Sequence, residues 1–337
     1  MKKIYTILSL ILSFGTIFAQ SIPFIGTGTL TANGWTTHSG TTGQMVIIST
    51  PSDNGNSLSY TGLADSSGNR TAMVAGNTED VNFPFTTPFT TGDVYFSALI
   101  KVLDASVLDS NATTGSYGLS LTSVASASTT VFQARIYTKQ GTTPGTFLLG
   151  VLNNSGGGAA PIFSSSNYTV NTTHLVVVKY NFTTNAAILI VDPTVGSPEP
   201  TTPTASSATG TTLAPTQIAG FVIRQAGTLT AGSGNIEVDE IRIGTTYATV
   251  TPSNLSTKQN DIVGLDIYPN PVTGNVLNIK TAANDTKTIN IFDVLGKQVL
   301  NLTTESATVN VSNLNAGIYI LKVTEDGKTA TRKLMIK

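Results

Sequence analysis

Apolar residues alternate with polar residues in a series of short segments between residues 93 and 243. In Asp93–Val102 (DVYFSALIKV) every second residue is apolar, which places those side chains on one face of a strand. Strands with one apolar face need a second sheet to cover it, so the pattern predicts an antiparallel β-sandwich. Similar segments, separated by Gly, Asn, Ser and Thr clusters, are Ser116–Thr122, Val131–Lys139, Phe147–Leu152, His174–Phe182, Ala187–Val191, Ile218–Arg224 and Ile236–Ile243.

The C-terminal residues carry the same pattern on a smaller scale. Asp326-Gly327 supplies the positive φ of a tight hairpin turn between two of the segments. We therefore predict an all-β chain, in which a jelly-roll (concanavalin A-like) β-sandwich at 21–250 precedes a small immunoglobulin-like β-sandwich at 262–337. The predicted C-terminal strands are Asp266–Tyr268, Val276–Lys280, Thr288–Asp293, Gln298–Leu302, Ala307–Val311, Ile318–Thr324 and Thr329–Ile336.

The first 19 residues have the pattern of a secretory signal peptide. Lys2 and Lys3 precede an uncharged apolar run from Ile4 to Ala19, and polar residues follow it. The run also contains Ser and Thr and is shorter than the roughly 20 residues that a membrane span needs. We expect cleavage after Ala19 and no membrane span in the mature protein.

Composition narrows the classes of function. Only 11% of the 337 residues are charged, and there is no cysteine. The absence of cysteine excludes a disulfide scaffold and a cysteine-ligated metal site. The low charge excludes a nucleic-acid binding protein of the usual kind, which needs clustered Lys and Arg. Residues 251–261 are polar and read as a linker between the two domains. Residues 192–217 are rich in Pro, Thr and Ser and predict a flexible loop inside the first domain.

Four strings near the C-terminus resemble a known transport domain. They are YPNP, IFDVLGK, LNAGIY and the terminal KLMIK, in this order and ending at the last residue. The C-terminal domain closely resembles the type A sorting domain of the type IX secretion system. The residues to which this resemblance assigns the sorting signal are Tyr268, Pro269, Asn270, Pro271, Gly296, Gly317, Tyr319, Lys333 and Lys337.

The resemblance implies a destination and a partner. Outer-membrane secretion machinery recognises such a domain, moves the attached cargo across the outer membrane and usually removes the domain. The expected location is therefore the cell surface or the medium, reached through the periplasm.

The first domain resembles the laminin G-like and concanavalin A-like jelly rolls of exported bacterial proteins. The residues that carry this resemblance are Gly34–Gly40, Thr173–Tyr180, Ala187–Asp192 and Asn235–Gly244. Most such modules bind glycans or other partners, and some are enzymes. The resemblance therefore implies a fold more firmly than a function.

The densest acidic cluster is Glu237-Val238-Asp239-Glu240. Jelly-roll glucanases use three carboxylates at i, i+2 and i+4 of one strand, so that all three share a face. Here Glu237 and Asp239 share a face, Glu240 is expected to point the other way, and the catalytic pattern is broken. A solvated strand face is the plain interpretation. A calcium site that uses Asp239 or Glu240 is a second hypothesis, and we assign no other cofactor.

Two further residues are candidates for ligand contact. Trp35 is the only tryptophan and lies in a Thr- and Gly-rich segment with His38. Its ring suits stacking on a sugar, although it could equally plug the edge of the sandwich. His174 opens an apolar strand and is expected to be a strand-edge residue.

Three functions remain open for the first domain. The leading hypothesis is a non-enzymatic binding or adhesion module for carbohydrate. The second is a polysaccharide-active enzyme whose acids lie on separate strands, such as Asp93, Glu79 or Asp80 with Glu237. The third is a structural component of the cell surface or matrix.

Overall fold

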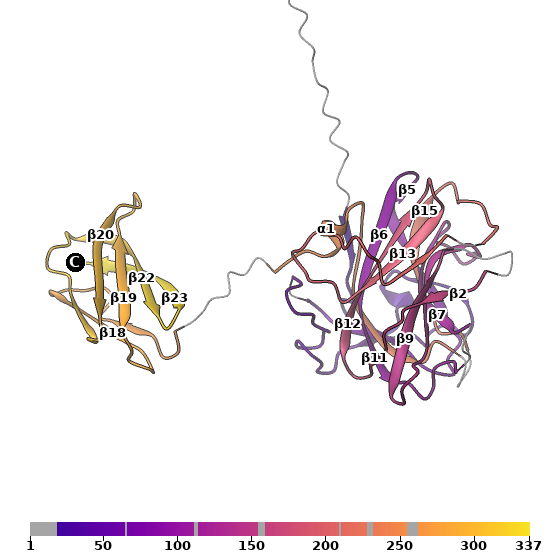
Figure 1. The fold of residues 1–337 in the computed structure, drawn as a ribbon, viewed down its shortest axis with the longest axis horizontal. Helices are drawn as coiled ribbons and strands as arrows, with labels where there is room; N and C mark the ends of the chain where they lie inside the picture. Colours follow the sequence, from indigo (N-terminus) through magenta and orange to yellow (C-terminus); the bar gives the residue numbers. More distant parts are fainter. Residues whose placement is uncertain are drawn as a thin grey trace, which may run out of the picture. The chain divides into compact units, whose positions relative to one another are not determined.

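A computed structural model describes residues 19–64, 66–110, 114–153, 159–208, 210–227, 232–254 and 262–337. The predicted signal peptide, apart from Ala19, and most of the predicted linker lie outside these residues. The chain divides into two compact units, one ending at Asn254 and one ending at Lys337. We call them the N-terminal unit and the C-terminal unit and describe each by itself (Figure 1).

The first sheet of the N-terminal unit has eight strands among the described residues, in the order β14-β13-β12-β6-β16-β4-β3, with β1 against β16. Its longest strands, β6 and β16, pair along most of their length in the middle of the sheet. The strands are β1 (Ala19–Ile22), β3 (Ile47–Ile48), β4 (Arg70–Met73), β6 (Asp93–Asp104), β12 (Thr173–Asn181), β13 (Ala186–Val191), β14 (Ala205–Ser207) and β16 (Asn235–Gly244).

The second sheet also has eight described strands, in the order β10-β9-β8-β7-β15-β5-β2, with β11 against β9. Every pair in both sheets is antiparallel. The strands are β2 (Thr36–Ser39), β5 (Asp80–Phe89), β7 (Ser116–Thr122), β8 (Phe132–Gln140), β9 (Thr146–Leu152), β10 (Ile162–Phe163), β11 (Tyr168–Thr169) and β15 (Ile218–Arg224).

The main core lies between these two sheets. Alternate residues of the central strands meet there, and Phe96 of β6 packs edge-on against Phe221 of β15 with ring centroids 5.2 Å apart. The first sheet is also apolar on its outer face, where Leu99, Leu175 and Val177 form a second buried cluster. A sheet buried on both faces explains why its central strands read as nearly continuous apolar runs.

The all-β jelly-roll prediction is confirmed, and the eight strands predicted for the N-terminal unit are present. The strands β1 to β4, β10, β11 and β14 escaped prediction because they have only two to four residues, too few to show a period. β5 was not predicted either; it contains Pro84 and Pro88, which are disfavoured inside strands. The segment 192–217, predicted as a flexible loop, contains β14, whose residues pair with Ala187–Leu189 of β13. Edge pairing orders a segment that has too few apolar side chains to fold alone.

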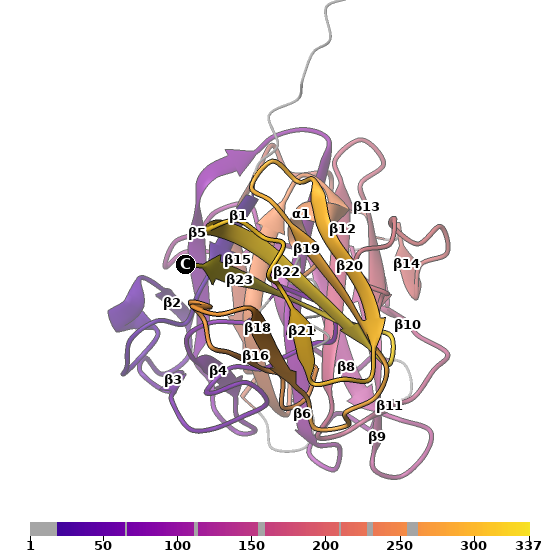
Figure 2. The ribbon, with the colours of Figure 1, turned by 90° about the vertical axis from the view of Figure 1, so that its left-hand side faces the viewer.

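The C-terminal unit is a small sandwich of a three-stranded and a four-stranded sheet, in the orders β17-β18-β21 and β20-β19-β22-β23 (Figure 2). Its core contains Leu277, Ile289, Ile291, Leu321 and Leu334. The strands are β17 (Asp266–Tyr268), β18 (Val276–Lys280), β19 (Lys287–Phe292), β20 (Gln298–Thr304), β21 (Thr308–Asn310), β22 (Gly317–Glu325) and β23 (Lys328–Ile336).

Among the residues that the structure describes, helical structure is limited to two short elements. These are the 3₁₀ turn η1 (Thr31–Asn33) and the helix α1 (Tyr247–Val250), which the Thr246 side chain caps by accepting from the Thr249 N–H. Within the described ranges, no helix is long and apolar enough to cross a membrane.

Candidate functional site

The acidic cluster lies on the outer face of the first sheet, and a β-bulge rearranges it. Asp239 pairs with Leu99 and Arg242 with Ser97, so Glu240 and Ile241 together oppose a single residue of β6. Glu240 has a φ of +49°, the left-handed conformation that such a bulge requires. The extra residue turns Glu240 to the same side as Asp239 and Arg242. The expectation that Glu240 faces the other way is wrong, because strict alternation ignores a bulge.

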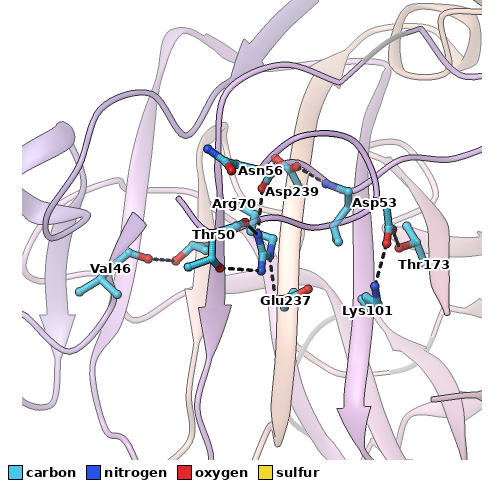
Figure 3. A network of polar contacts seen from close by, with 11 residues as sticks. Val46, Thr50, Asp53, Asn56, Arg70, Lys101, Thr173, Glu237 and Asp239 are labelled. Carbon is cyan, nitrogen blue, oxygen red and sulfur yellow. Dashed lines mark hydrogen bonds and ion pairs between the residues drawn. The ribbon is translucent and has the colours of Figure 1, made fainter. Parts of the chain in front are cut away.

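These acids are buried, so the interpretation as a solvated strand face is wrong too. Glu237, Asp239 and Glu240 are 8%, 1% and 9% exposed. Residues 50–64 and 66–69 cross the outer face and cover them; we call these residues the covering segment (Figure 3).

Arg70 joins the covering segment to the sheet. Its Nε donates to Glu237 Oε1 at 2.7 Å, and its Nη1 donates to the carbonyls of Thr50 and Asn56 at 2.7 and 2.9 Å (Figure 3). Both side chains of the ion pair are buried. One guanidinium thus ties two points of the covering segment to β16, which is a structural role.

Asp239 and Glu240 hold the same segment through its backbone. Asp239 Oδ2 accepts from the Leu58 N–H and Oδ1 from the Glu240 N–H, both at 2.8 Å. Glu240 Oε1 accepts from the Ser67 N–H at 2.8 Å, and Oε2 accepts from Arg242 Nη2 at 2.5 Å.

The structure does not support the calcium hypothesis for Asp239 and Glu240. All four carboxylate oxygens already face N–H donors, whereas a calcium ion needs six to eight oxygen ligands around it. In the part of the chain that the structure describes, no group of three or more acidic, His or Cys side chains is placed to hold a metal ion.

Asp239 should make the stability of the N-terminal unit depend on pH. Burial, assisted by the charge of Glu240, raises the pKa of Asp239 to about 7. Between pH 4 and 7 the folded state therefore binds more protons than the unfolded state, so this stabilisation is present at acid pH and is lost as the pH rises towards 7. We expect the stability difference between the wild type and Asp239→Asn to favour the wild type more at pH 5 than at pH 8, measured by urea unfolding.

Asp53→Asn is the control for this titration. Asp53 belongs to the same covering segment, and although burial raises its pKa, hydrogen bonds from Lys101 and Thr173 outweigh burial and lower it. Asp53 is therefore ionised in both states above pH 5, and its substitution should leave the pH dependence between 5 and 8 unchanged. If the free energy of unfolding changed equally with pH in Asp239→Asn and in the wild type, this result would contradict the raised pKa of Asp239.

Trp35 is part of the core. It is 4% exposed and stacks on Phe24 with an interplanar angle of 9° and ring centroids 6.0 Å apart. Phe83 packs against it at 5.3 Å. Of the two interpretations drawn from the sequence, the structure favours the plug at the sandwich edge, because the ring belongs to the core cluster and packs against Phe24 and Phe83.

His38 leads to a second group of side chains, on the outer face of the second sheet. Its ring lies 5.6 Å from that of Phe132, and its Nδ1 is 3.2 Å from the Asn82 side-chain amide. Burial, together with the charge of Arg224, lowers the pKa of His38 to about 4, so the ring is neutral at pH 7. Of the two ligand-contact candidates, only His38 lies beside a partly exposed aromatic surface.

We call this surface the arginine face and define it as Tyr117, Phe132, Arg135, Tyr137 and Arg224. Because Ile136 belongs to the core, its strand neighbours Arg135 and Tyr137 point outward. Tyr117 lies opposite Tyr137 in the neighbouring strand, with ring centroids 5.6 Å apart. The guanidinium carbons of Arg135 and Arg224 lie 5.3 and 4.4 Å from the Tyr117 ring centre.

Several buried polar atoms on or beside the arginine face have no hydrogen-bond partner among the described residues. They are Nε and Nη2 of Arg135, Oγ of Ser120 and Oδ1 of Asn82. Each such atom costs about 1–3 kcal/mol, so a cluster of them needs an explanation such as a missing ligand. One signal of this face is present in the sequence, namely aromatic and cationic residues at the polar positions of predicted strands.

The residues of the sorting signal mostly shape the C-terminal unit. The Asn270 side chain donates to the Lys333 carbonyl at 2.8 Å and accepts from the Met335 N–H at 3.0 Å, which fixes the YPNP turn, with Pro269 and Pro271, against β23. Tyr319 is nearly buried and donates to the Asn315 carbonyl at 2.8 Å.

The other residues of the signal are exposed or sit at turns. Tyr268 is 46% exposed, and Lys333 and Lys337 are exposed as well. Gly296 has a φ of +84° in the turn after β19. Gly317 begins β22, and a Cβ there would meet the Tyr319 ring at 3.7 Å.

A buried ion pair in the C-terminal unit was not predicted from sequence. Lys287 and Glu325, cross-strand neighbours in β19 and β22, are 3.3 Å apart with side chains 0% and 3% exposed. Lys287 Nζ also donates to the Asp285 carbonyl at 2.8 Å, and Thr281 Oγ1 donates to Glu325 Oε1 at 2.7 Å.

The comparison with protein families decides what the C-terminal unit is. Residues 266–337 match the family described as the secretion system C-terminal sorting domain. The C-terminal unit is a type IX sorting domain. The resemblance seen in the YPNP, IFDVLGK and LNAGIY strings is confirmed, and the sorting domain directs the protein to the cell surface or the extracellular space.

Comparisons with known proteins reach the N-terminal unit only at the level of fold. No curated protein sequence matches the chain. Among solved structures, the globular domain of T. cruzi calreticulin is 12% identical, with 70% of this chain and 90% of that chain covered and a TM-score of 0.35. A peanut lectin is 12% identical, with 59% and 95% covered and a TM-score of 0.33.

A sialidase gives a similar result. It is 11% identical with a TM-score of 0.35, and the match covers 69% of this chain but only 19% of the sialidase. We base no assignment of activity, ligand or partner on these likenesses.

Proposed function

We propose that this exported protein carries a non-enzymatic N-terminal unit that binds carbohydrate at the arginine face. The observation that supports this most directly is the set of unpartnered buried atoms of Arg135, Ser120 and Asn82 next to partly exposed aromatic rings. Binding sites for small molecules combine apolar rings with a few converging polar groups in this way.

The two kinds of group would divide the work of holding a sugar. Tyr117 and Phe132, with ring centroids 6.1 Å apart, present apolar ring surface to the C–H groups of a pyranose. Arg135, Ser120 and Asn82 supply the donors and acceptors that sugar hydroxyls require. The strands of a rigid sheet carry all of these groups, which keeps the loss of conformational entropy on binding small.

Tyr117→Ala should abolish most of this binding. The ring touches both guanidinium groups and both other rings of the arginine face, so its removal should weaken glycan binding at least about tenfold, as for a central aromatic anchor. A glycan array followed by titration of the full chain measures this effect. Tyr268→Ala is the control, because Tyr268 is 46% exposed and belongs to the other unit.

Three outcomes would contradict the proposal. The first is that no glycan is retained at millimolar concentration while the protein assembles with rising concentration, which would favour a structural surface component. The second is unchanged binding by Tyr117→Ala. The third is release of reducing sugars from a polysaccharide, which would favour the enzyme alternative.

The contacts of Glu79, Glu237 and His174 favour structural roles for these three side chains. Glu79 is buried, and its carboxylate accepts from Thr37 Oγ1, the Gly43 N–H and the Met45 N–H at 2.6–2.9 Å. Glu237 belongs to the other sheet and pairs with Arg70. His174 lies 2.7 Å from Asp192, but its second ring nitrogen faces the Thr169 carbonyl at 3.3 Å, where a triad would place a nucleophile.

A further inference from the structure

We propose that the ligand of the arginine face is an acidic saccharide, whose carboxylate pairs with Arg135. This inference rests on the proposed carbohydrate-binding function and specifies the class of sugar. The ligand class is a saccharide that carries a carboxylate, and the recognising group is the guanidinium edge formed by Nε and Nη2.

Arg135 is an uncompensated buried cation. It is 8% exposed, and among the described residues its side chain makes one hydrogen bond, a long one of 3.4 Å from Nη1 to the Tyr137 hydroxyl. No ion pair joins it to a carboxylate among the residues that the structure describes, whereas Arg224 has Asp80 at 3.8 Å. A buried charge is ordinarily paired, so the missing partner of Arg135 is expected to be an anion.

The backbone around Arg135 is arranged to hold it in place. Ala134 has a φ of +52°, and two residues of β8, Ala134 and Arg135, oppose the single residue Ser120 of β7 at a bulge. A non-glycine residue in this conformation stores strain, and bulges next to binding sites redirect side chains. Here the bulge places Arg135 beside Ser120 and Tyr117.

The electrostatics of the surface agree with an anionic ligand. Two guanidinium groups flank Tyr117, and the neighbouring His38 is neutral at pH 7. Among the described residues, Asp80 is the one carboxylate that pairs with this cluster. Nε and Nη2 of Arg135 are buried and have no hydrogen-bond partner among the described residues, and together they form two parallel donors, the geometry that binds the two oxygens of a carboxylate. A neutral sugar offers no group that satisfies both donors and the charge.

The matched probes are oligogalacturonate and its methyl ester, which share the same ring and differ in the charge of the carboxyl group. The full-length chain would be titrated with both by calorimetry, alongside oligoalginate and sialyllactose, which test other sources of the carboxylate. We expect the acid to bind at least tenfold more tightly than the ester, and added salt to weaken binding of the acid only.

Arg135→Lys keeps the charge but removes the paired donors. We expect it to lose most of the preference for the acid while it still binds the ester. Arg224→Lys, at a half-buried position, is a second variant if Arg135→Lys unfolds, and it should reduce the preference less. Arg332→Lys in the sorting domain is the control. Thermal unfolding of each variant verifies the fold.

Each outcome separates this inference from the proposed function. Equal binding of acid and ester, both lost in Tyr117→Ala, would overturn the acidic class and leave carbohydrate binding standing. Binding of sialyllactose or oligoalginate but not of oligogalacturonate would support the acidic class and identify which sugar supplies the carboxylate. An Arg135→Lys variant with unchanged preference would overturn the role of Arg135, and binding of none of the probes would count against both proposals.

Discussion

Lys287→Met is expected to destabilise the sorting domain strongly. The substitution leaves the Glu325 carboxylate buried without its cation, and removal of one partner of a buried ion pair costs about 3–5 kcal/mol. A domain of this size has a total stability of only about 5–15 kcal/mol, so the loss should lower its melting temperature by more than about 12 °C. The long apolar side chain of Met fills the space of the Lys287 stem, so the loss of stability measures the removal of the charge and not the creation of a cavity.

Hydrogen exchange of the full-length chain is the suitable measurement because it resolves the two units. Peptides from β19, β22 and β23 should lose protection, while those from the N-terminal unit should not. Lys322→Met is the matched control, since Lys322 also lies on β22 but is exposed. Retained protection in β19 and β22 of Lys287→Met would show that the pair contributes little.

Glu237→Gln is the second substitution for which we expect a large effect. It leaves the buried Arg70 guanidinium without a counter-charge and weakens the attachment of the covering segment at Thr50 and Asn56. The expected loss is again about 3–5 kcal/mol, or about 10 °C in a unit of this size. The fluorescence of Trp35, the only tryptophan of the chain, follows unfolding of this unit.

The control lies in the same segment. Asp53 pairs with Lys101 at 2.8 Å, but both side chains are partly exposed, at 25% and 18%. Exposed pairs contribute at most about 1 kcal/mol, so Asp53→Asn should change the melting temperature little. Equal effects of the two substitutions would show that burial does not govern the strength of these pairs.

Loss of a polysaccharide-degrading activity in Glu237→Gln at unchanged stability would instead support the enzyme alternative.

The sequence indicated the sheets well wherever the apolar pattern was long. β7, β15, β17 and β18 have the bounds that alternation predicts, because a strand with one buried face must alternate. The sorting domain could be recognised because its turns need Pro, Gly and Asn at fixed places, and these leave readable strings. The short strands β1 to β4, β10, β11 and β14 and the proline-containing strand β5 gave no such signal, since their pairing depends on neighbours distant in the chain.

For the candidate sites, the sequence indicated individual residues, and the fold decided their contacts. The sequence singled out Glu237, Asp239 and Glu240 but could not show that a covering segment, some 170 residues earlier in the chain, uses their oxygens. It singled out Trp35, which only packing places inside the core. The arginine face draws on β7, β8 and β15, and no local pattern brings Tyr117, Arg135 and Arg224 together.

The sequence by itself determined the all-β class and the export route of this protein. Both depend on local features, namely the period of two in apolar residues and the turn residues of the sorting domain. Only the tertiary structure decided which charges are buried and which lack a partner. Burial and pairing are set by contacts between distant segments, such as Arg70 with Glu237 and Lys287 with Glu325, and by bulges that turn Glu240 and Arg135 out of the simple alternation.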